Sequence, residues 1–197
     1  RGEFLMAKAL KRRRIDMLNG SIWNKIPLFA LLVAATAVLE QLFNAADIAV
    51  VGNFTGELKN ICVAAVGANS SIINLIVTLF IGVALGVNVV IANAVGRKDD
   101  KSVKKAVHTA VLFAIIGGFT VAVLGQFIAE PLLKLLNVPK DVLPYAVLYL
   151  RIYLIGMPVI LLYNFEAAIY RSIGETKTPL IALAASGVLN IVLNLFF

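Results

Sequence analysis

Five long apolar runs dominate this 197-residue chain and limit what it can fold into. A helix needs about 20 predominantly apolar residues to cross the hydrocarbon core of a bilayer. The sequence reaches this length repeatedly, so we expect an all-α membrane protein, a polytopic bundle of transmembrane helices. The predicted helices cover about residues 26–51, 61–95, 103–136, 142–172 and 178–197.

The composition indicates lipid rather than water as the surroundings of most side chains. Hydrophobic residues make up 60% of the chain and charged residues 15%, whereas a soluble domain has about half and about a quarter. The single Cys62 excludes a disulfide framework within the chain, and the single His108 argues against a multi-histidine metal site. The basic residues behind the net charge of +7 lie in short segments between apolar runs, so we expect no nucleic-acid partner.

The distribution of Lys and Arg predicts the orientation in the membrane. Residues 1–25 form a basic tail, in which we interpret residues 1–5 as an expression scar. Alternate connecting segments carry fourteen basic residues on one side and three on the other. The positive-inside rule then predicts a multi-pass cell-membrane protein with a cytoplasmic N-terminus. Because the last run is still apolar at Phe197, we interpret residues 26–197 as a partial transmembrane lobe of something longer.

A polar stripe interrupts the first predicted helix. Thr36, Glu40, Asn44 and Asp47 follow one another at spacings of 4, 4 and 3 residues, which places them on one helical face. A carboxylate at the bilayer centre costs about 2.5–3.5 kcal/mol on insertion scales, so the stripe should face protein or a water-filled cavity. Desolvation favours a neutral carboxyl, so either acid could carry a proton, or it could ligate a monovalent cation. The alternative is that Glu40 and Asp47 meet lipid headgroups.

Two other helices carry polar stripes, for which packing is the competing explanation. The fifth has Ser186, Asn190 and Asn194 at spacings of 4, which suits either an ion site or hydrogen bonds between helices. We expect the second to pack closely through its small residues, with cavity lining as the alternative. Its stripe consists of Ser71, Asn74, Thr78, Gly82 and Gly86.

The fourth predicted helix contains a proline and several polar aromatic residues. Pro158 should kink it. Glu166 either pairs with Arg171 or a basic loop residue, or lies on a substrate path. The candidate cavity residues are Glu40, Gln41, Asn74, Tyr153, Tyr163 and Glu166.

Four stretches resemble the N-terminal lobe of multidrug and toxic compound extrusion (MATE) transporters. The order and spacing of these motifs carry the likeness from about Leu18 to Phe197. They are "LNGSIWNKI", "LFNAADIAVVG", "GVNVVIANAVGRKDD" and "RSIGETKTPLIALAASGVLNIVLNLFF". The resemblance implies two six-helix lobes around a central cavity, of which this chain holds about five helices and lacks the C-terminal lobe.

The resemblance also implies roles for individual residues. Asp47 matches the first-helix carboxylate of the ion-coupling site, and Asn190 matches its fifth-helix Asn. Asn194 stands where many members have Asp, which removes one negative charge, and Glu175 replaces the usual Asp of the loop. We expect Asp47, Asn190, Asn194 and Asn44 to form the ion-coupling site, with Na⁺ at Asp47 and Asn190 if sodium is the ion.

The implied activity is secondary transport, with no enzyme activity and no cofactor. Small organic compounds, cationic or amphipathic, would leave in exchange for H⁺ or Na⁺ through a protein that is a monomer when complete. One alternative is a flippase for lipid-linked precursors in the same superfamily. The acidic intramembrane residues disfavour it, since such cargo needs a cationic cavity and Arg151 is the main basic residue within the apolar runs. Another alternative is an inactive truncated membrane fragment.

Overall fold

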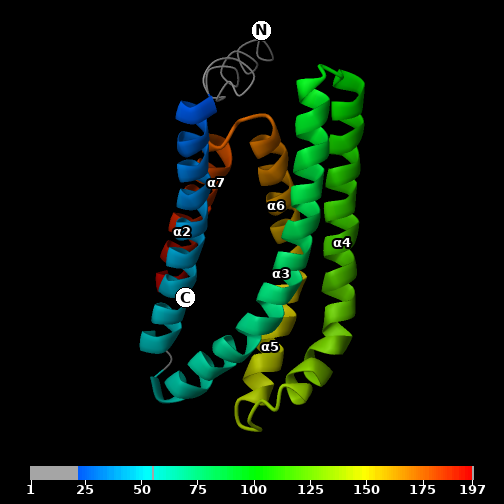
Figure 1. The fold of residues 1–197 in the computed structure, drawn as a ribbon. Helices are drawn as coiled ribbons and strands as arrows, with labels where there is room; N and C mark the ends of the chain where they lie inside the picture. The colour runs from blue at the N-terminus through cyan, green and yellow to red at the C-terminus, as the bar shows by residue number, and fades with distance from the viewer. Residues whose placement is uncertain (1–21, 55, 197) are drawn as a thin grey trace. The chain divides into compact units, whose positions relative to one another are not determined.

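The computed structural model describes residues 22–54 and 56–196, which are helical over most of their length and contain no strand. This confirms the all-α prediction. The expected scar and most of the basic tail lie outside the described residues, as does Phe197. In chain order (Figure 1), the helices are α2 (Ile22–Phe54), α3 (Lys59–Gly96), α4 (Asp100–Leu135), α5 (Leu143–Ile155), α6 (Met157–Ser172) and α7 (Lys177–Phe196), with a 3₁₀ turn at Gly56–Leu58.

The described helices have the length and apolar surface of membrane spans. Four of them qualify singly, and α5 with α6 forms a fifth span if the bent pair is counted as one. Large apolar side chains stay exposed along them; Leu75, Phe127 and Val159 each keep 73–75% of their surface uncovered. Water would penalise so much apolar surface on one chain, whereas lipid does not. The chain is therefore a multi-pass helical membrane protein.

The predicted fourth helix is two helices with a break at Gly156. Between α5 and α6 the axis bends by 50°, where the Gly156 N–H donates to the Tyr153 carbonyl at 3.0 Å. Pro158 has no N–H and its ring excludes the preceding helical carbonyl, so the regular ladder ends just before it. The predicted kink is confirmed, but it interrupts the helix two residues before the proline.

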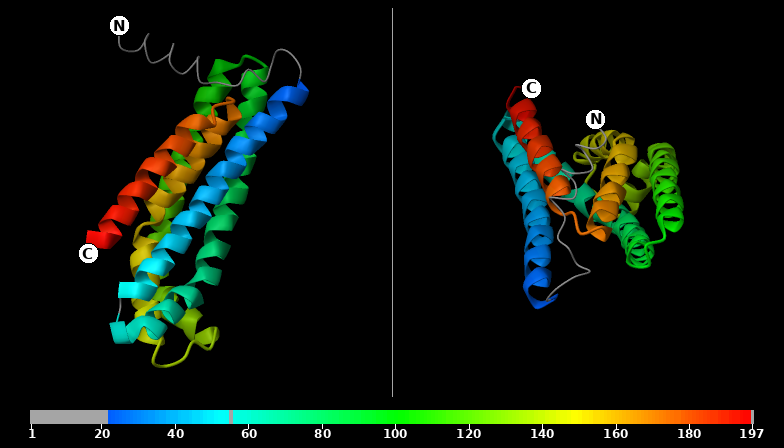
Figure 2. Two further views of the ribbon diagram at one scale, coloured as in Figure 1. Left: turned by 90° about the vertical axis from the view of Figure 1, so that its left-hand side faces the viewer. Right: turned by 90° about the horizontal axis from the view of Figure 1, so that it is seen from above.

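The chain divides into two compact units, which we describe separately. Of the described residues, 22–44, 85–108 and 166–196 belong to unit 1, and 45–54, 56–84 and 109–165 belong to unit 2. Within unit 1, α2 and α7 lie side by side in both ribbon views (Figure 2) and touch at Phe43 and Gly187, where a Cβ on the glycine would overlap the phenylalanine ring. The Asn88 amide also donates to the Ala168 carbonyl at 3.2 Å, which joins α3 to α6.

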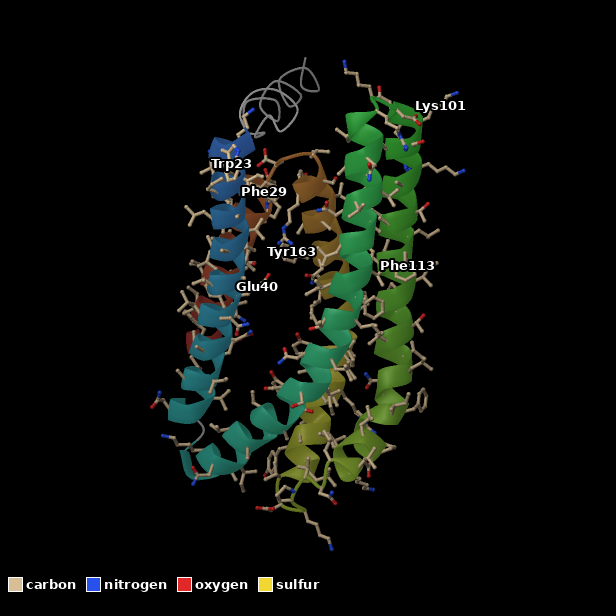
Figure 3. All side chains as sticks on the ribbon, viewed as in Figure 1. Trp23, Phe29, Glu40, Lys101, Phe113 and Tyr163 are labelled. Atoms are coloured by element: carbon tan, nitrogen blue, oxygen red, sulfur yellow. The ribbon has the colours of Figure 1, made fainter. Side chains whose placement is uncertain are left out.

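Small residues on α4 let the helices of unit 2 approach closely. Gly118 is buried, and a Cβ there would overlap the backbone of Pro158 on α6. Beside this contact, Phe113 (Figure 3) has its ring centroid 6.4 Å from that of Phe80 and 5.8 Å from that of Phe165. The core of unit 2 therefore combines close backbone contact with an aromatic cluster.

The glycine pair expected to mediate close packing does not do so. A Cβ built on Gly82 or on Gly86 would meet nothing within 4 Å, and both residues are exposed. Ser71, Asn74 and Thr78 are also exposed. The prediction of packing was wrong here because the α3 residues that meet other helices lie on different faces. Asn69 is one of them: its buried amide donates to the Ala146 carbonyl of α5 at 2.9 Å.

Asp99 caps the start of α4. Its carboxylate accepts hydrogen bonds from the Ser102 backbone N–H at 3.1 Å and from the Ser102 hydroxyl at 2.6 Å. These bonds, led by that of the hydroxyl, hold the pKa of Asp99 below its usual range. A depressed folded-state pKa gives stability that is present above the unfolded value near 4 and is lost as pH falls further.

We therefore expect Asp99→Ala to lower the melting temperature at neutral pH, and this deficit to shrink as pH falls below about 4 and then through the depressed pKa of the folded cap. Thermal melts of the detergent-purified chain across this pH range provide the measurement. Asp99→Asn keeps an acceptor oxygen but not the charge, so as the control it should show a smaller deficit at neutral pH than Asp99→Ala. If Asp99→Ala lowered the melting temperature equally at neutral pH and at the acid end of the range, the charge of Asp99 would have no role in capping.

Glu175 caps the start of α7 from a fully buried position. One carboxylate oxygen accepts the backbone N–H groups of Lys177 at 3.0 Å and Thr178 at 3.1 Å. Backbone N–H groups in the first turn of a helix have no carbonyl partner within that helix. The Glu175 side chain therefore gives these two N–H groups a hydrogen bond that they would otherwise lack. The sequence identified Glu175 only as a substitution at a turn.

Glu175→Ala should lower stability by about 1 kcal/mol or more, the usual effect of losing a helix cap. Glu175→Gln keeps an acceptor oxygen and should lose less. The exposed neighbour Lys177→Ala provides a matched control. Unfolding of the three variants in detergent would be compared, and equal losses for the Ala and Gln variants at position 175 would argue against capping.

Candidate functional site

The polar stripe of the first predicted helix lies on α2, and its members differ in exposure. Thr36 is buried and its hydroxyl donates to the Leu32 carbonyl of the same helix at 3.1 Å. Glu40 and Asp47 are half-buried, while Asn44 is exposed. The two carboxylates thus lie on the more covered side of the helix, and Asn44 lies at its edge. Gln41, a cavity candidate, is also exposed.

Asp47 belongs to unit 2, where it interacts with a tyrosine of α5. The Asp47 carboxylate and Tyr149 interact electrostatically. The Tyr149 ring stacks on that of Tyr153 with centroids 6.4 Å apart and an interplanar angle of 30°. A phenol beside a carboxylate can donate a hydrogen bond and can present an aromatic face to a cation. The sequence pointed to Tyr153 and missed Tyr149, although one helical turn separates them.

The amides of α7 form a pair within unit 1. The Asn194 side chain donates to the Asn190 amide oxygen at 3.2 Å, and both residues are half-buried. Ser186, the third member of this stripe, donates to the Leu183 carbonyl at 3.0 Å. Asp47 lies in unit 2, whereas Asn190 and Asn194 lie in unit 1, so we describe the two parts of the predicted ion site separately.

Arg171 is the basic residue that acts on Glu40, and both belong to unit 1. Arg171 lies in the last turn of α6, within the predicted helix 142–172, and is half-buried. The expected pairing of Glu166 with Arg171 was wrong. Glu166 is exposed and makes no ion pair among residues 22–54 and 56–196. Five helical positions separate the two residues by about 140° around the axis.

The remaining cavity candidates fall in different places. Tyr163 is half-buried on α6 (Figure 3) and belongs to unit 2, as does the exposed Asn74 of α3. The expected pairing of Glu166 with a basic loop residue is likewise absent from the described part of the chain.

A second charged cluster in unit 2 was not predicted. Glu130 of α4 pairs with Lys134 at 2.7 Å and approaches Arg151 of α5 at 4.0 Å. Gln126 donates to the Arg151 carbonyl at 3.1 Å, which ties the two helices together. The charged side chains are 43–59% exposed, so the cluster adds little stability but keeps Arg151 beside an acid. In the described part of the chain, no group of three His, Cys, Asp or Glu residues is placed to hold a metal ion.

The fold and these intramembrane polar groups define a polytopic helical membrane protein with ionisable residues inside its spans. The chain belongs to the MatE family, whose model matches residues 33–196.

Two curated relatives and a solved structure are similar to most of this chain. It is 30% identical over 173 residues to the probable multidrug resistance protein YoeA of Bacillus subtilis, covering 88% of this chain and 37% of that protein. It is 30% identical over 184 residues to the probable multidrug resistance protein YpnP of the same organism, covering 92% and 40%. A crystal structure of MATE in the bent conformation matches its fold with a TM-score of 0.82 at 22% identity, covering 90% of this chain and 39% of that one. The chain thus spans about two fifths of the length of these relatives.

Proposed function

We propose that this chain is the first lobe of a secondary active transporter that exports cationic or amphipathic organic compounds in exchange for H⁺ or Na⁺. The observation that carries the proposal is Asp47, a half-buried carboxylate within the spanning helix α2 that interacts with Tyr149. Ionisable residues inside spans mark ion or substrate pathways by default. Membership of the MatE family and the similarity to two probable multidrug resistance proteins support transport rather than catalysis.

Asp47 would couple the driving ion to export by changing its charge. A proton neutralises the carboxylate, and Na⁺ compensates it with help from neutral oxygens. Either event lowers the cost of holding Asp47 in a dry environment, so the ion favours the conformation in which Asp47 is more covered. In this proposal the neutral amides of Asn44, Asn190 and Asn194 supply the remaining ligands or hydrogen bonds. Gln41, Asn74, Tyr153, Tyr163 and Glu166 stay candidates for the substrate cavity.

Alternating access needs a second lobe that moves against this one. We therefore propose that the chain works in a complete transporter of two lobes, monomeric in the cell membrane, with the N-terminus in the cytoplasm. Exposed basic residues at the turn from α3 to α4 support this orientation; they are Arg97, Lys98, Lys101, Lys104 and Lys105.

A vesicle assay with the complete transporter separates this proposal from the flippase and fragment alternatives. We expect gradient-driven export of ethidium, a permanent organic cation, and no transfer of a fluorescent pyrophosphate-linked lipid between leaflets. Lipid transfer without ethidium export would favour the flippase. The same vesicles made with this chain alone should show no export, because one lobe cannot alternate; export by the single lobe would contradict the two-lobe mechanism.

A further inference from the structure

Three lysines lie close together on the first two turns of α4. Lys101 and Lys105 are four positions apart and therefore lie on the same side of the helix, and Lys104 lies beside them. All three are exposed, and Figure 3 shows Lys101 at the end of α4 that joins α3. We call Lys101, Lys104 and Lys105 the basic face of α4.

The apolar surface of α4 continues in line with the basic face. Beyond Lys105 the same side of the helix carries His108, Leu112, Phe119 and Val123, at spacings of 3, 4, 7 and 4 residues. The three apolar members of this row are 57–59% exposed. Both parts of the row belong to the single unbroken helix Asp100–Leu135, so helical geometry alone aligns them. The basic face therefore lies on the side of α4 that presents apolar residues to lipid.

The opposite side of α4 packs against protein. Ala114 is buried, and it lies nine positions from Lys105, which turns the helix by about 180°. Along the axis, seven positions or about 10 Å separate Lys105 from Leu112. The headgroup layer extends about 5–7 Å beyond the hydrocarbon core, and a lysine can direct its long side chain toward that layer. With Leu112 just inside the hydrocarbon, the ammonium groups of the basic face reach the phosphates.

The acidic residues at this end of α4 do not cancel the charge of the basic face. The Asp99 carboxylate already accepts two hydrogen bonds from Ser102. Asp100 lies five positions from Lys105, about 140° around the helix axis. Lys101 and Lys104 make no ion pair within 4.0 Å among residues 22–54 and 56–196. The basic face therefore presents a net positive charge at the level of the headgroups.

We propose that this side of α4 binds an anionic phospholipid, with the phosphate at the basic face and an acyl chain along Leu112 and Phe119. Charge complementarity selects the headgroup, since clustered lysines at the end of a span attract anionic lipids. The continuous row selects a molecule that joins an anionic head to apolar chains, whereas a nucleic acid or an acidic protein segment matches only the cationic part. In the orientation proposed above, the lipid belongs to the cytoplasmic leaflet. The inference goes beyond the transport function and does not depend on it.

Lipid titrations of this chain in detergent, read by native mass spectrometry, test the site. The probes are dioctanoyl phosphatidylglycerol, zwitterionic dioctanoyl phosphatidylcholine, and glycerophosphoglycerol, which has the anionic headgroup without acyl chains. We expect phosphatidylglycerol to bind about tenfold or more tightly than either of the other two. Added salt should reduce this preference, because salt screens exposed charges.

Substitutions separate the basic face from a general effect of positive charge. Replacing all three of its lysines by glutamine should weaken binding of phosphatidylglycerol about tenfold or more, and Lys101→Gln alone should weaken it about fivefold. The matched control replaces the exposed Lys59, Lys134 and Lys140 by glutamine, which removes the same net charge and should keep the preference. Replacing the basic-face lysines by arginine retains the charge and should keep it as well.

Several outcomes would overturn the inference. Equal affinities of the unsubstituted chain for phosphatidylglycerol and phosphatidylcholine would do so, as would equal losses in the basic-face and control variants. Glycerophosphoglycerol binding as tightly as phosphatidylglycerol would show a site for a free phosphate group rather than for a lipid. Monodispersity and the melting temperature of each variant separate lost binding from lost folding, and Lys101→Gln decides the matter if the triple glutamine variant does not fold.

Discussion

We expect Asp47→Asn to remove ion-driven efflux from the proposed complete transporter, while the protein still folds and inserts. Asparagine keeps the size of the side chain but cannot take up a proton, and its neutral amide holds Na⁺ poorly without a carboxylate. The driving ion then no longer favours one conformation over another. Coupling free energies of about 1–3 kcal/mol correspond to about 5- to 150-fold, so the ion-dependent rate should fall by that factor.

Efflux of ethidium from vesicles, with and without an imposed H⁺ or Na⁺ gradient, measures this effect. Asp47→Glu keeps the charge and should retain part of the coupling, and Leu42→Ala on an exposed apolar position of the same helix should retain all of it. If the gradient accelerated efflux equally in Asp47→Asn and in the unsubstituted transporter, the assignment of Asp47 would be wrong.

Gly118→Ala should cause the largest loss of stability among single-methyl additions to this chain. The new Cβ would overlap the Pro158 backbone and lie 2.9 Å from its nitrogen. Backbone atoms of a packed helix cannot move aside as a flexible side chain can, so α4 and α6 would have to separate. Overpacking of this kind costs about 1–3 kcal/mol, and Gly118→Val should cost more.

Gly82→Ala is the matched control, because it adds the same methyl group to a helical position with nothing within 4 Å. It should leave stability unchanged or raise it slightly, since alanine has the higher helix propensity. Thermal unfolding of both variants in the same detergent makes the comparison. Equal melting temperatures for Gly118→Ala and Gly82→Ala would show that the contact with Pro158 does not limit stability.

The sequence predicted the spans well because lipid imposes a length and an apolar composition that can be counted along the chain. The break between α5 and α6 was also foreseeable from Pro158, although Gly156 sets where the helix ends. Which glycines meet another helix was not foreseeable. Gly82 and Gly86 have the familiar spacing, yet a Cβ on either would meet nothing within 4 Å, whereas Gly118 and Pro158 are forty residues apart and come together through the tertiary fold alone.

The sequence predicted individual polar residues of the candidate site, but not which residues of other helices they interact with. Spacing along α2 and α7 pointed to Glu40, Asp47 and Asn190 as intramembrane polar groups, and the structure places them within those helices. The effect of Arg171 on Glu40 was not predicted, because the two residues lie on different helices. Which residues of different helices lie close together depends on how the helices pack, and the spacing of residues along one helix does not predict this packing.

We propose that an ion gradient drives export through a transporter that contains this lobe. Its most direct test is the rate of ethidium efflux from vesicles holding the complete transporter, measured before and after an inward-directed H⁺ or Na⁺ gradient is imposed. We expect one of the two gradients to accelerate efflux, and we expect an ionophore that collapses this gradient to return the rate to its starting value. An efflux rate that neither gradient changes would contradict it.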